Sequence, residues 1–403
     1  MPVNLPPLGE LLPVDGIELG AAAAGIRYRG RDDLAVVVLG EGSVVGGVFT
    51  TSSYRAAPVI VASERLGKAR ALVINSGNAN AATGERGLAD ARASTSHLAA
   101  KLGVTENEVL PFSTGVIGEF LDVDAMRQGI DAALAARSER GWEAAARAIM
   151  TTDTAPKAVS AHGRVQGARI RATGMVKGSG MIRPDMATML AFLGTDATLS
   201  ASAARSLAQD LAERSFNRLT IDGDTSTNDS FVVMASGRAG PTIDAPRGEA
   251  YAELRELLTP LVVELAERTV RDGEGATKFV TIVVDGGRTA AECLEVAYTI
   301  AHSPLVKTAI FAGDPNWGRF CMAIGRANIE NLDPDLVNLD LDQVPVARNG
   351  LVADDYVEEQ AAAVMAKDEF TVRVHLGRGQ ASETIWTSDL SYEYVRINAE
   401  YRS

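Results

Sequence analysis

Cysteine and histidine are scarce in this chain of 403 residues, which contains two cysteines and four histidines. Cys293 and Cys321 each lie among apolar residues, so we expect free buried thiols rather than a disulfide. The chain has no CxxC pair, and no two histidines have the spacing of zinc ligands, which argues against a structural zinc site. It also lacks the GxSxG motif of an α/β-hydrolase nucleophile. A catalytic base other than histidine therefore has to be considered.

Long hydrophobic runs and an excess of positive charge are also lacking. The longest apolar runs, such as LAVVVLG at 34–40, are far shorter than the ~20 residues that a membrane helix needs. The first residues, MPVNLPPLGELLPVDG, do not have the basic and apolar regions of a signal peptide. The net charge is −13, whereas proteins that bind nucleic acid use Lys and Arg to neutralise phosphates. We expect a cytoplasmic protein with no membrane and no nucleic-acid partner.

The residues that are present are typical of a globular enzyme, with 46% hydrophobic and 23% charged residues. The length exceeds the ~250–300 residues of a single core, so we expect two domains or lobes. Short β-branched segments bounded by glycine predict strands, and apolar residues at helical spacing predict helices. The predicted strands are 34–40, 46–50, 58–63, 69–77, 279–287 and 370–376, and the predicted helices lie around 122–134, 200–216 and 251–273. The pattern indicates a mixed α/β protein. The composition does not show where the boundary between the two lobes lies.

Four polar segments each admit a functional and a structural interpretation. PFSTGVIGE (111–119) has the hydroxyl and bare backbone of an oxyanion hole, but a strand-to-loop turn explains it as well. KGSGM (177–181) is suited to a carboxylate ligand, although its glycine spacing is not that of a phosphate loop. DGDTSTND (222–229) gathers three carboxylates, for which turn chemistry is favoured over a metal site. RDGEGATK (271–278) presents a glutamate to a substrate ammonium or simply to solvent.

The segment MATML (186–190) contains a threonine that is suited to self-cleavage. A threonine hydroxyl needs a base before it acts as a nucleophile. If the chain is cut before Thr188, the new α-amine, with a pKa near ~8, serves as that base. The same hydroxyl is able to attack the preceding carbonyl, and the small Ala187 does not obstruct that attack. A buried structural threonine is the alternative.

The ordered set of motifs resembles the ornithine acetyltransferase family of arginine biosynthesis, also described as bifunctional glutamate N-acetyltransferase/amino-acid acetyltransferase. The resemblance extends from residue 48 to residue 403. Its motifs are VFTTSSYRAAPV, NSGNANAATG, PFSTGVIGE, MTTDTAPK, KGSGMIRPDMATML, SFNRLTIDGDTSTND, RDGEGATKF, HSPLVKTA, DPNWGR and YVRINAEYRS.

The resemblance implies a precursor cleaved between Ala187 and Thr188 into an α chain (1–187) and a β chain (188–403). Thr188 then becomes the N-terminal nucleophile, with Thr114 and Gly115 as the oxyanion pair. The implied substrate-binding residues are Thr151 or Thr152, Lys177, Thr188, Glu274, Asn398 and Ser403. The family often ends in threonine, and Ser403 retains the hydroxyl, so we expect a small effect.

The implied reaction moves an acetyl group from N2-acetylornithine to glutamate through an acetyl-threonine, and it requires no metal or redox cofactor. Acetyl-CoA is a second acetyl donor only if the family's second activity is present. The implied fold is a layered α/β sandwich with a smaller C-terminal lobe, and the implied assembly is an α2β2 heterotetramer. Two alternatives are a self-cleaving N-terminal-nucleophile hydrolase or aminopeptidase and a binding homologue without catalysis.

Overall fold

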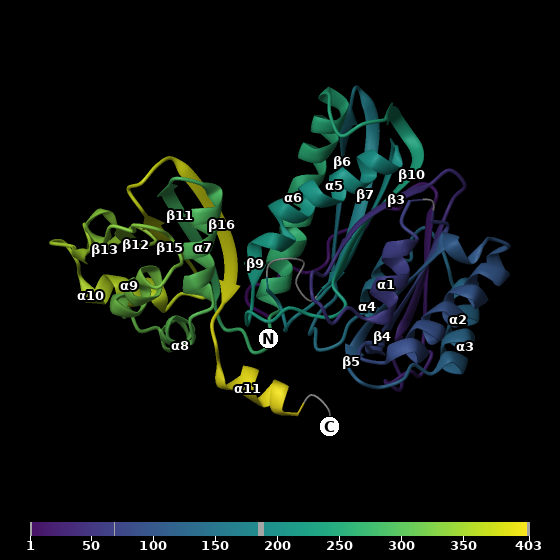
Figure 1. The fold of residues 1–403 in the computed structure, drawn as a ribbon, viewed down its shortest axis with the longest axis horizontal. Helices are drawn as coiled ribbons and strands as arrows, with labels where there is room; N and C mark the ends of the chain where they lie inside the picture. Colours follow the sequence, from purple (N-terminus) through teal and green to yellow (C-terminus); the bar gives the residue numbers. More distant parts are fainter. Residues whose placement is uncertain (1, 68, 184–188, 401–403) are drawn as a thin grey trace. The chain divides into compact units, whose positions relative to one another are not determined.

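The computed structural model describes residues 2–67, 69–183 and 189–400, and Figure 1 shows its fold. The chain divides into two compact units. The N-terminal unit contains residues 6–217 and 224–269, and the C-terminal unit contains residues 1–5, 218–223 and 270–403. The expectation of two lobes is confirmed. The division does not follow the predicted boundary between the α and β chains, because both units draw on residues from either side of it.

The N-terminal unit contains two β-sheets. The four-stranded sheet has the order β1-β2-β4-β5, and the five-stranded sheet has the order β3-β10-β8-β7-β6. The strands are β1 (Ile17–Ala22), β2 (Leu34–Leu39), β3 (Val44–Phe49), β4 (Ala71–Asn78), β5 (Val109–Val116), β6 (Lys157–Val165), β7 (Ala168–Lys177), β8 (Leu190–Leu199) and β10 (Ser230–Ile243). Strand β5 is parallel to β4 and β8 is parallel to β10, so each sheet is mixed.

The two sheets pack face to face over a common apolar core. Alternate residues of both sheets point into it, and Phe112 of β5 meets Phe192 of β8 edge-on with ring centroids 5.1 Å apart. Helices α2 and α3 bury a second cluster against the outer face of the four-stranded sheet. Helix α5 packs on β3 and β10, and leucines of α6 contact glycines of β6 and β7. The prediction of a layered α/β sandwich is confirmed.

The three predicted helices of this unit are confirmed as α3, α5 and α6, whereas α1, α2 and α4 were not predicted as helices. The helices of this unit are α1 (Ala57–Glu64), α2 (Gly84–Leu102), α3 (Val123–Ala135), α4 (Trp142–Ala148), α5 (Ala201–Arg214) and α6 (Glu249–Arg271), the last of which ends in the C-terminal unit. The side chain of Asp122 caps α3, for which Asp122 and Asp124 were both candidates, and the side chain of Ser200 caps α5. Helix α6 is unbroken and includes Pro260.

The predicted strand 58–63 is wrong, because these residues belong to helix α1. Pro58 occupies the first turn, where its missing N–H leaves no hydrogen bond unmade. Most of the helix is buried, so it shows no amphipathic period to distinguish it from a buried strand. The β-branched residues of PVIVAS favoured the strand interpretation, and tertiary packing overrides that preference.

The C-terminal unit is built on a seven-stranded sheet of order β14-β13-β12-β15-β11-β16-β9. The strands are β9 (Leu219–Thr220), β11 (Phe279–Gly287), β12 (Asn338–Leu341), β13 (Val344–Arg348), β14 (Leu351–Val352), β15 (Glu369–His375) and β16 (Ala381–Ser388). The helices are α7 (Ala290–Ala301), α8 (Pro304–Ala312), α9 (Trp317–Gly325), α10 (Glu358–Met365) and α11 (Tyr392–Ala399). Strands 279–287 and 370–376 were predicted, and both are confirmed within one residue.

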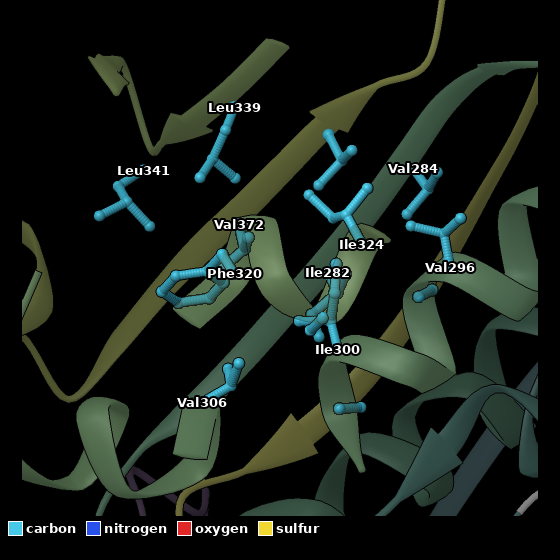
Figure 2. Close-up of a cluster of buried hydrophobic side chains, with 14 of the residues drawn as sticks. Ile282, Val284, Val296, Ile300, Val306, Phe320, Ile324, Leu339, Leu341 and Val372 are labelled. Carbon is cyan, nitrogen blue, oxygen red and sulfur yellow. The ribbon is translucent and has the colours of Figure 1, made fainter. Parts of the chain in front are cut away.

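Alternation along the central strands places their apolar residues against the helices. Val372 of β15 and Ile282 of β11 pack with Ile300 of α7 and Phe320 of α9 in one buried cluster (Figure 2). Cys293 of α7 belongs to the same cluster, and both cysteines are free thiols. Among the described residues, no helix is both long and apolar enough to cross a membrane.

Candidate active site

Thr114 and Gly115 lie near the end of β5, where the backbone approaches β4 closely. Gly115 has φ +134°, and a Cβ atom at this position would lie 2.2 Å from the carbonyl carbon of Gly77. Only glycine fits this approach. Thr114 is buried, and its Oγ1 accepts a hydrogen bond of 3.2 Å from Lys177 Nζ. Because that lone pair is used by the lysine, the hydroxyl proton is directed to a different acceptor.

Lys177 is the last residue of β7 and is buried with Thr114 in the N-terminal unit. The turn that follows it is held by the MTTDT segment. Asp153 Oδ1 accepts the Gly178 N–H at 2.7 Å, and its Oδ2 accepts the Thr151 N–H at 2.9 Å. Thr152 Oγ1 lies 2.7 Å from Ser179 Oγ. The structure thus brings Thr114, Thr151, Thr152 and Lys177 into one connected group, and either threonine remains a candidate substrate ligand.

Asp153 is the anion at the centre of this group. Lys157 Nζ donates to Asp153 Oδ1 at 2.7 Å, and both side chains are completely inaccessible to solvent. Burial acts to raise the pKa of Asp153, but the charges of Lys157 and Lys177 and the hydrogen bonds outweigh it and hold the pKa below its usual range. The carboxylate is therefore ionised at neutral pH, and it compensates the two buried lysine charges.

Ala187 and Thr188, the predicted cleavage site, lie outside the described residues, as does Ser403. The residue after Thr188 is described. Met189 is buried, its N–H donates to Asp229 Oδ1 at 3.0 Å, and its carbonyl accepts the Ser230 N–H at 3.0 Å. The chain directly following Thr188 is thus anchored to β10 in the N-terminal unit.

Asp229 is completely buried within this anchor. Burial raises the pKa of Asp229 well above its usual range, although the Met189 N–H and the positive charge of Lys177 act in the opposite direction. The two buried acids near Lys177 thus have opposite shifts. Asp153, paired with a lysine, is held ionised, whereas the environment of Asp229 favours the protonated acid.

The two other predicted ligands contact each other in the C-terminal unit. Asn398 of α11 donates from Nδ2 to Glu274 Oε2 at 2.8 Å. Glu274 is largely buried in the loop after α6, and the next residue, Gly275, has φ +67° and accepts a hydrogen bond of 2.6 Å from Ser391 Oγ. The loop therefore presents a carboxylate whose orientation depends on the C-terminal helix.

The carboxylates of DGDTSTND are divided between the two units. Asp222 belongs to the C-terminal unit and accepts a hydrogen bond from the Tyr394 hydroxyl at 3.1 Å, whereas Asp229 belongs to the N-terminal unit. Within residues 2–67, 69–183 and 189–400, no group of three or more His, Cys, Asp or Glu side chains is arranged to hold a metal ion.

Comparison with known proteins agrees with the family suggested by the motifs. The sequence profile of the ArgJ family matches residues 18–403. The arginine biosynthesis bifunctional protein ArgJ of Pseudomonas fluorescens (strain Pf0-1) is 52% identical, with 100% of both chains covered. The chain belongs to the ArgJ family. The family resemblance found in the sequence and the prediction that the chain is an enzyme are both confirmed.

Two solved structures are also similar to this chain. The arginine biosynthesis bifunctional protein of Bacillus halodurans is 36% identical, with 51% of this chain and 96% of that chain covered and a TM-score of 0.48. Ornithine acetyltransferase of Mycobacterium tuberculosis, solved with ornithine, is 33% identical over 44% of this chain and 94% of that chain, with a TM-score of 0.38.

Sequence reasoning missed Asp153, Lys157 and Asp229, which contact the candidate site residues of this ArgJ family member or their neighbours. Asp153 and Lys157 are four residues apart in MTTDTAPK, and this spacing of opposite charges was an available signal. Asp229 was interpreted as part of a turn in DGDTSTND, with a metal site as the less favoured alternative. Its position beside the residue after Thr188 depends on β8 and β10 being neighbours, which no local pattern in the sequence reveals.

We predict that Asp153→Asn lowers the free energy of unfolding by about 3–5 kcal/mol, because it leaves buried lysine charges uncompensated. The control is Asp131→Asn, which removes a half-exposed carboxylate paired with Lys101 at 2.8 Å and should cost at most ~1 kcal/mol. Urea unfolding at neutral pH measures both.

The difference in the free energy of unfolding between wild type and Asp153→Asn should depend on pH in a defined direction. The pKa of Asp153 is lower in the folded protein than in the unfolded chain, so its contribution is fully present above pH ~4 and is lost as the pH falls through the folded pKa. The gap between wild type and Asp153→Asn should therefore shrink in acid. Equal losses for Asp153→Asn and Asp131→Asn at neutral pH would contradict the charge-compensation account.

Proposed function

We propose that this ArgJ family member transfers the acetyl group of N2-acetyl-L-ornithine to L-glutamate through an ester on Thr188. The observation that carries the proposal is the buried contact of 3.2 Å between Lys177 Nζ and Thr114 Oγ1. In this contact Lys177 supplies a cation that suits a substrate carboxylate. Thr114 supplies a hydroxyl whose proton is directed to an acceptor other than the lysine. Both residues lie in the same unit as Met189, which follows Thr188 in the chain.

Self-cleavage is the first proposed step. Thr188 Oγ attacks the carbonyl carbon of Ala187, the C–N bond breaks, and the acyl group moves from nitrogen to oxygen. The released α-amine takes up the hydroxyl proton. Water then hydrolyses the ester, leaving a carboxylate on Ala187 and a free Thr188 at the start of the β chain. The proposed products are thus chains 1–187 and 188–403.

Acetyl transfer follows with the same nucleophile. The α-amine of Thr188 accepts the hydroxyl proton as Oγ attacks the acetyl carbonyl of acetylornithine. The C–N bond of the substrate breaks, its nitrogen takes the proton, and ornithine leaves. The α-amine of glutamate then attacks the acetyl ester, and Thr188 Oγ leaves and regains a proton. The negative oxygen of each tetrahedral intermediate is bound by the Thr114 hydroxyl and the Gly115 N–H.

Charge explains how one site accepts two substrates. Both carry an α-carboxylate, which suits the ammonium group of Lys177. Ornithine also carries a side-chain ammonium, for which the largely buried Glu274, oriented by Asn398, is a suitable partner. Hydroxyls of Thr151 or Thr152 and Ser403 complete the proposed set of ligands.

The proposed reaction uses no metal or redox cofactor, because the threonine itself carries the acetyl group. Acetyl-CoA is proposed as a second donor, which would acylate the same hydroxyl. The family resemblance supports an α2β2 assembly in the cytoplasm.

The test of this function follows the acetyl group. Purified protein is incubated with glutamate and acetylornithine that carries a deuterated acetyl group, and the products are identified by mass spectrometry. We expect deuterated N-acetylglutamate, two protein fragments that meet at Ala187–Thr188, and neither outcome with Thr188→Ala. Release of the label as free acetate in the presence of glutamate would instead establish the hydrolase alternative. A parallel reaction with acetyl-CoA tests the second donor.

We predict that Thr114→Ala lowers kcat by about 10²–10³, the usual effect of losing one oxyanion donor. Rates are normalised to cleaved protein, because the same donor is proposed to assist self-cleavage. Thr195→Ala is the matched control, since Thr195 is a buried threonine of β8 whose hydroxyl donates to the carbonyl of Arg171 at 3.0 Å and accepts the N–H of Ala197 at 3.3 Å. Equal kcat values for the two cleaved variants would remove Thr114 from the mechanism.

A further inference from the structure

Two adjacent side chains of the STND segment (226–229) form hydrogen bonds with the backbone of Ser113 and of Met189. Asn228 Nδ2 donates to the carbonyl of Ser113 at 2.8 Å and to that of Ala79 at 2.7 Å. Asp229 Oδ1 accepts the N–H of Met189 at 3.0 Å. Ser113 directly precedes Thr114, and Met189 directly follows Thr188. One short segment thus contacts the backbone next to each of the two proposed catalytic hydroxyls.

The segment is itself held firmly in the N-terminal unit. Asn228 and Asp229 are 5% and 0% exposed, so none of their three hydrogen bonds competes with bulk water. The Asp229 carbonyl accepts the N–H of Thr50 at 3.0 Å, and the Thr50 hydroxyl donates to the Ser226 carbonyl at 2.7 Å. Strand β3 therefore supports the segment from the other side, and a shift of either side chain would break bonds that water cannot replace.

Burial of the Asp229 carboxyl destabilises the folded state, which is unexpected for a residue with a purely structural role. In the part of the chain that the structure describes, no lysine or arginine forms an ion pair with it, and its buried Oδ2 has no hydrogen-bond partner. A buried polar atom without a partner destabilises the folded state. The raised pKa of this carboxyl agrees with that environment. Buried acids with perturbed titration occur preferentially near catalytic groups.

We infer that Asn228 and Asp229 are positioning residues that set the separation between the Thr188 hydroxyl and the Thr114 oxyanion donor. This inference rests on the proposed function. Each side chain acts on the neighbouring peptide, not on the substrate. Asn228 fixes the peptide before Thr114, and Asp229 fixes the peptide after Thr188. A loss of either hydrogen bond releases one side of the site while the other stays in place.

The size of the effect follows from geometry. The nucleophile and the oxyanion donor must be placed together relative to one carbonyl group, and a displacement of about 1 Å costs on the order of 10²-fold in rate. Lys177 remains attached to Thr114 in such variants, so binding of the substrate carboxylate is retained. The inference therefore predicts a loss in kcat with little change in KM.

The test compares isosteric substitutions at two buried aspartates of the N-terminal unit, Asp229 directly before β10 and Asp196 within β8. Asp229→Leu removes the acceptor of the Met189 N–H, whereas Asp229→Asn keeps a carbonyl oxygen in its place. The control is Asp196→Leu, because Asp196 of β8 is 3% exposed and accepts one backbone N–H, that of Arg171, at 2.8 Å. Melting temperature, fraction cleaved, and the kcat and KM of the cleaved protein are measured for each.

We expect Asp229→Leu to lower kcat by about 10²-fold with KM retained, and Asp229→Asn to recover most of that loss. Asp196→Leu should lower the melting temperature in a similar way but leave kcat unchanged. Asn228→Ala tests the other contact and should also lower kcat. It serves as the deciding variant if Asp229→Leu does not fold.

Equal kcat values for cleaved Asp229→Leu and Asp196→Leu would overturn the inference, as would wild-type kcat in Asn228→Ala. A drop in Asp229→Leu that Asp229→Asn does not restore would contradict the hydrogen bond as its cause. Wild-type protein assayed in parallel separates this inference from the proposed function. If wild type forms no acetyl-enzyme, the proposed function fails, and with it the reaction to which the positioning refers.

Discussion

Compensation of buried charge at Asp153 is the constraint on which the candidate site residues of the N-terminal unit depend. Lys177 is a buried cation at the end of β7, and such a charge is expensive unless an anion and hydrogen bonds accompany it. Asp153 supplies the negative charge, pairs with Lys157 at 2.7 Å, and accepts the N–H groups of Gly178 and Thr151. Because one carboxylate serves two lysines and two loops, the position of the cation and the positions of the nearby hydroxyls are determined together.

The layered sheets give this group a rigid frame. Strands β5 and β8 face each other across one apolar core, where Phe112 meets Phe192, so their ends do not move independently. Thr114 lies near the end of β5, and β8 begins two residues after Thr188. Gly115 lets the β5 backbone approach Gly77 at a distance that any side chain would prevent. In this arrangement the packing of the sheets determines where the candidate site residues lie, and a few buried polar groups provide the hydrogen bonds and charges of the site.

Sequence reasoning predicted the secondary structure where periodicity was clear and failed where it was absent. The alternation of 370–376 and the capped helix at 122–134 are confirmed, whereas the fully apolar segment 58–63 was assigned to the wrong class. Residues of PFSTGVIGE and KGSGM were identified as candidates, and the Thr114–Lys177 contact brings them together. Asp153 was missed although Lys157 lies only four residues further along the chain, whereas Asp229 was missed because Met189 is 40 residues away. Only the order of strands in the sheet reveals the contact between Asp229 and Met189.

The central claim is that Thr188 itself carries the acetyl group. The most direct measurement is the mass of the peptide that begins at residue 188, after incubation of wild-type protein with acetylornithine in the absence of glutamate. We predict that this peptide gains one acetyl group as one ornithine is released per site, and that later addition of glutamate removes the acetyl group. An unmodified peptide under conditions in which the same preparation produces N-acetylglutamate at its full rate would contradict the claim.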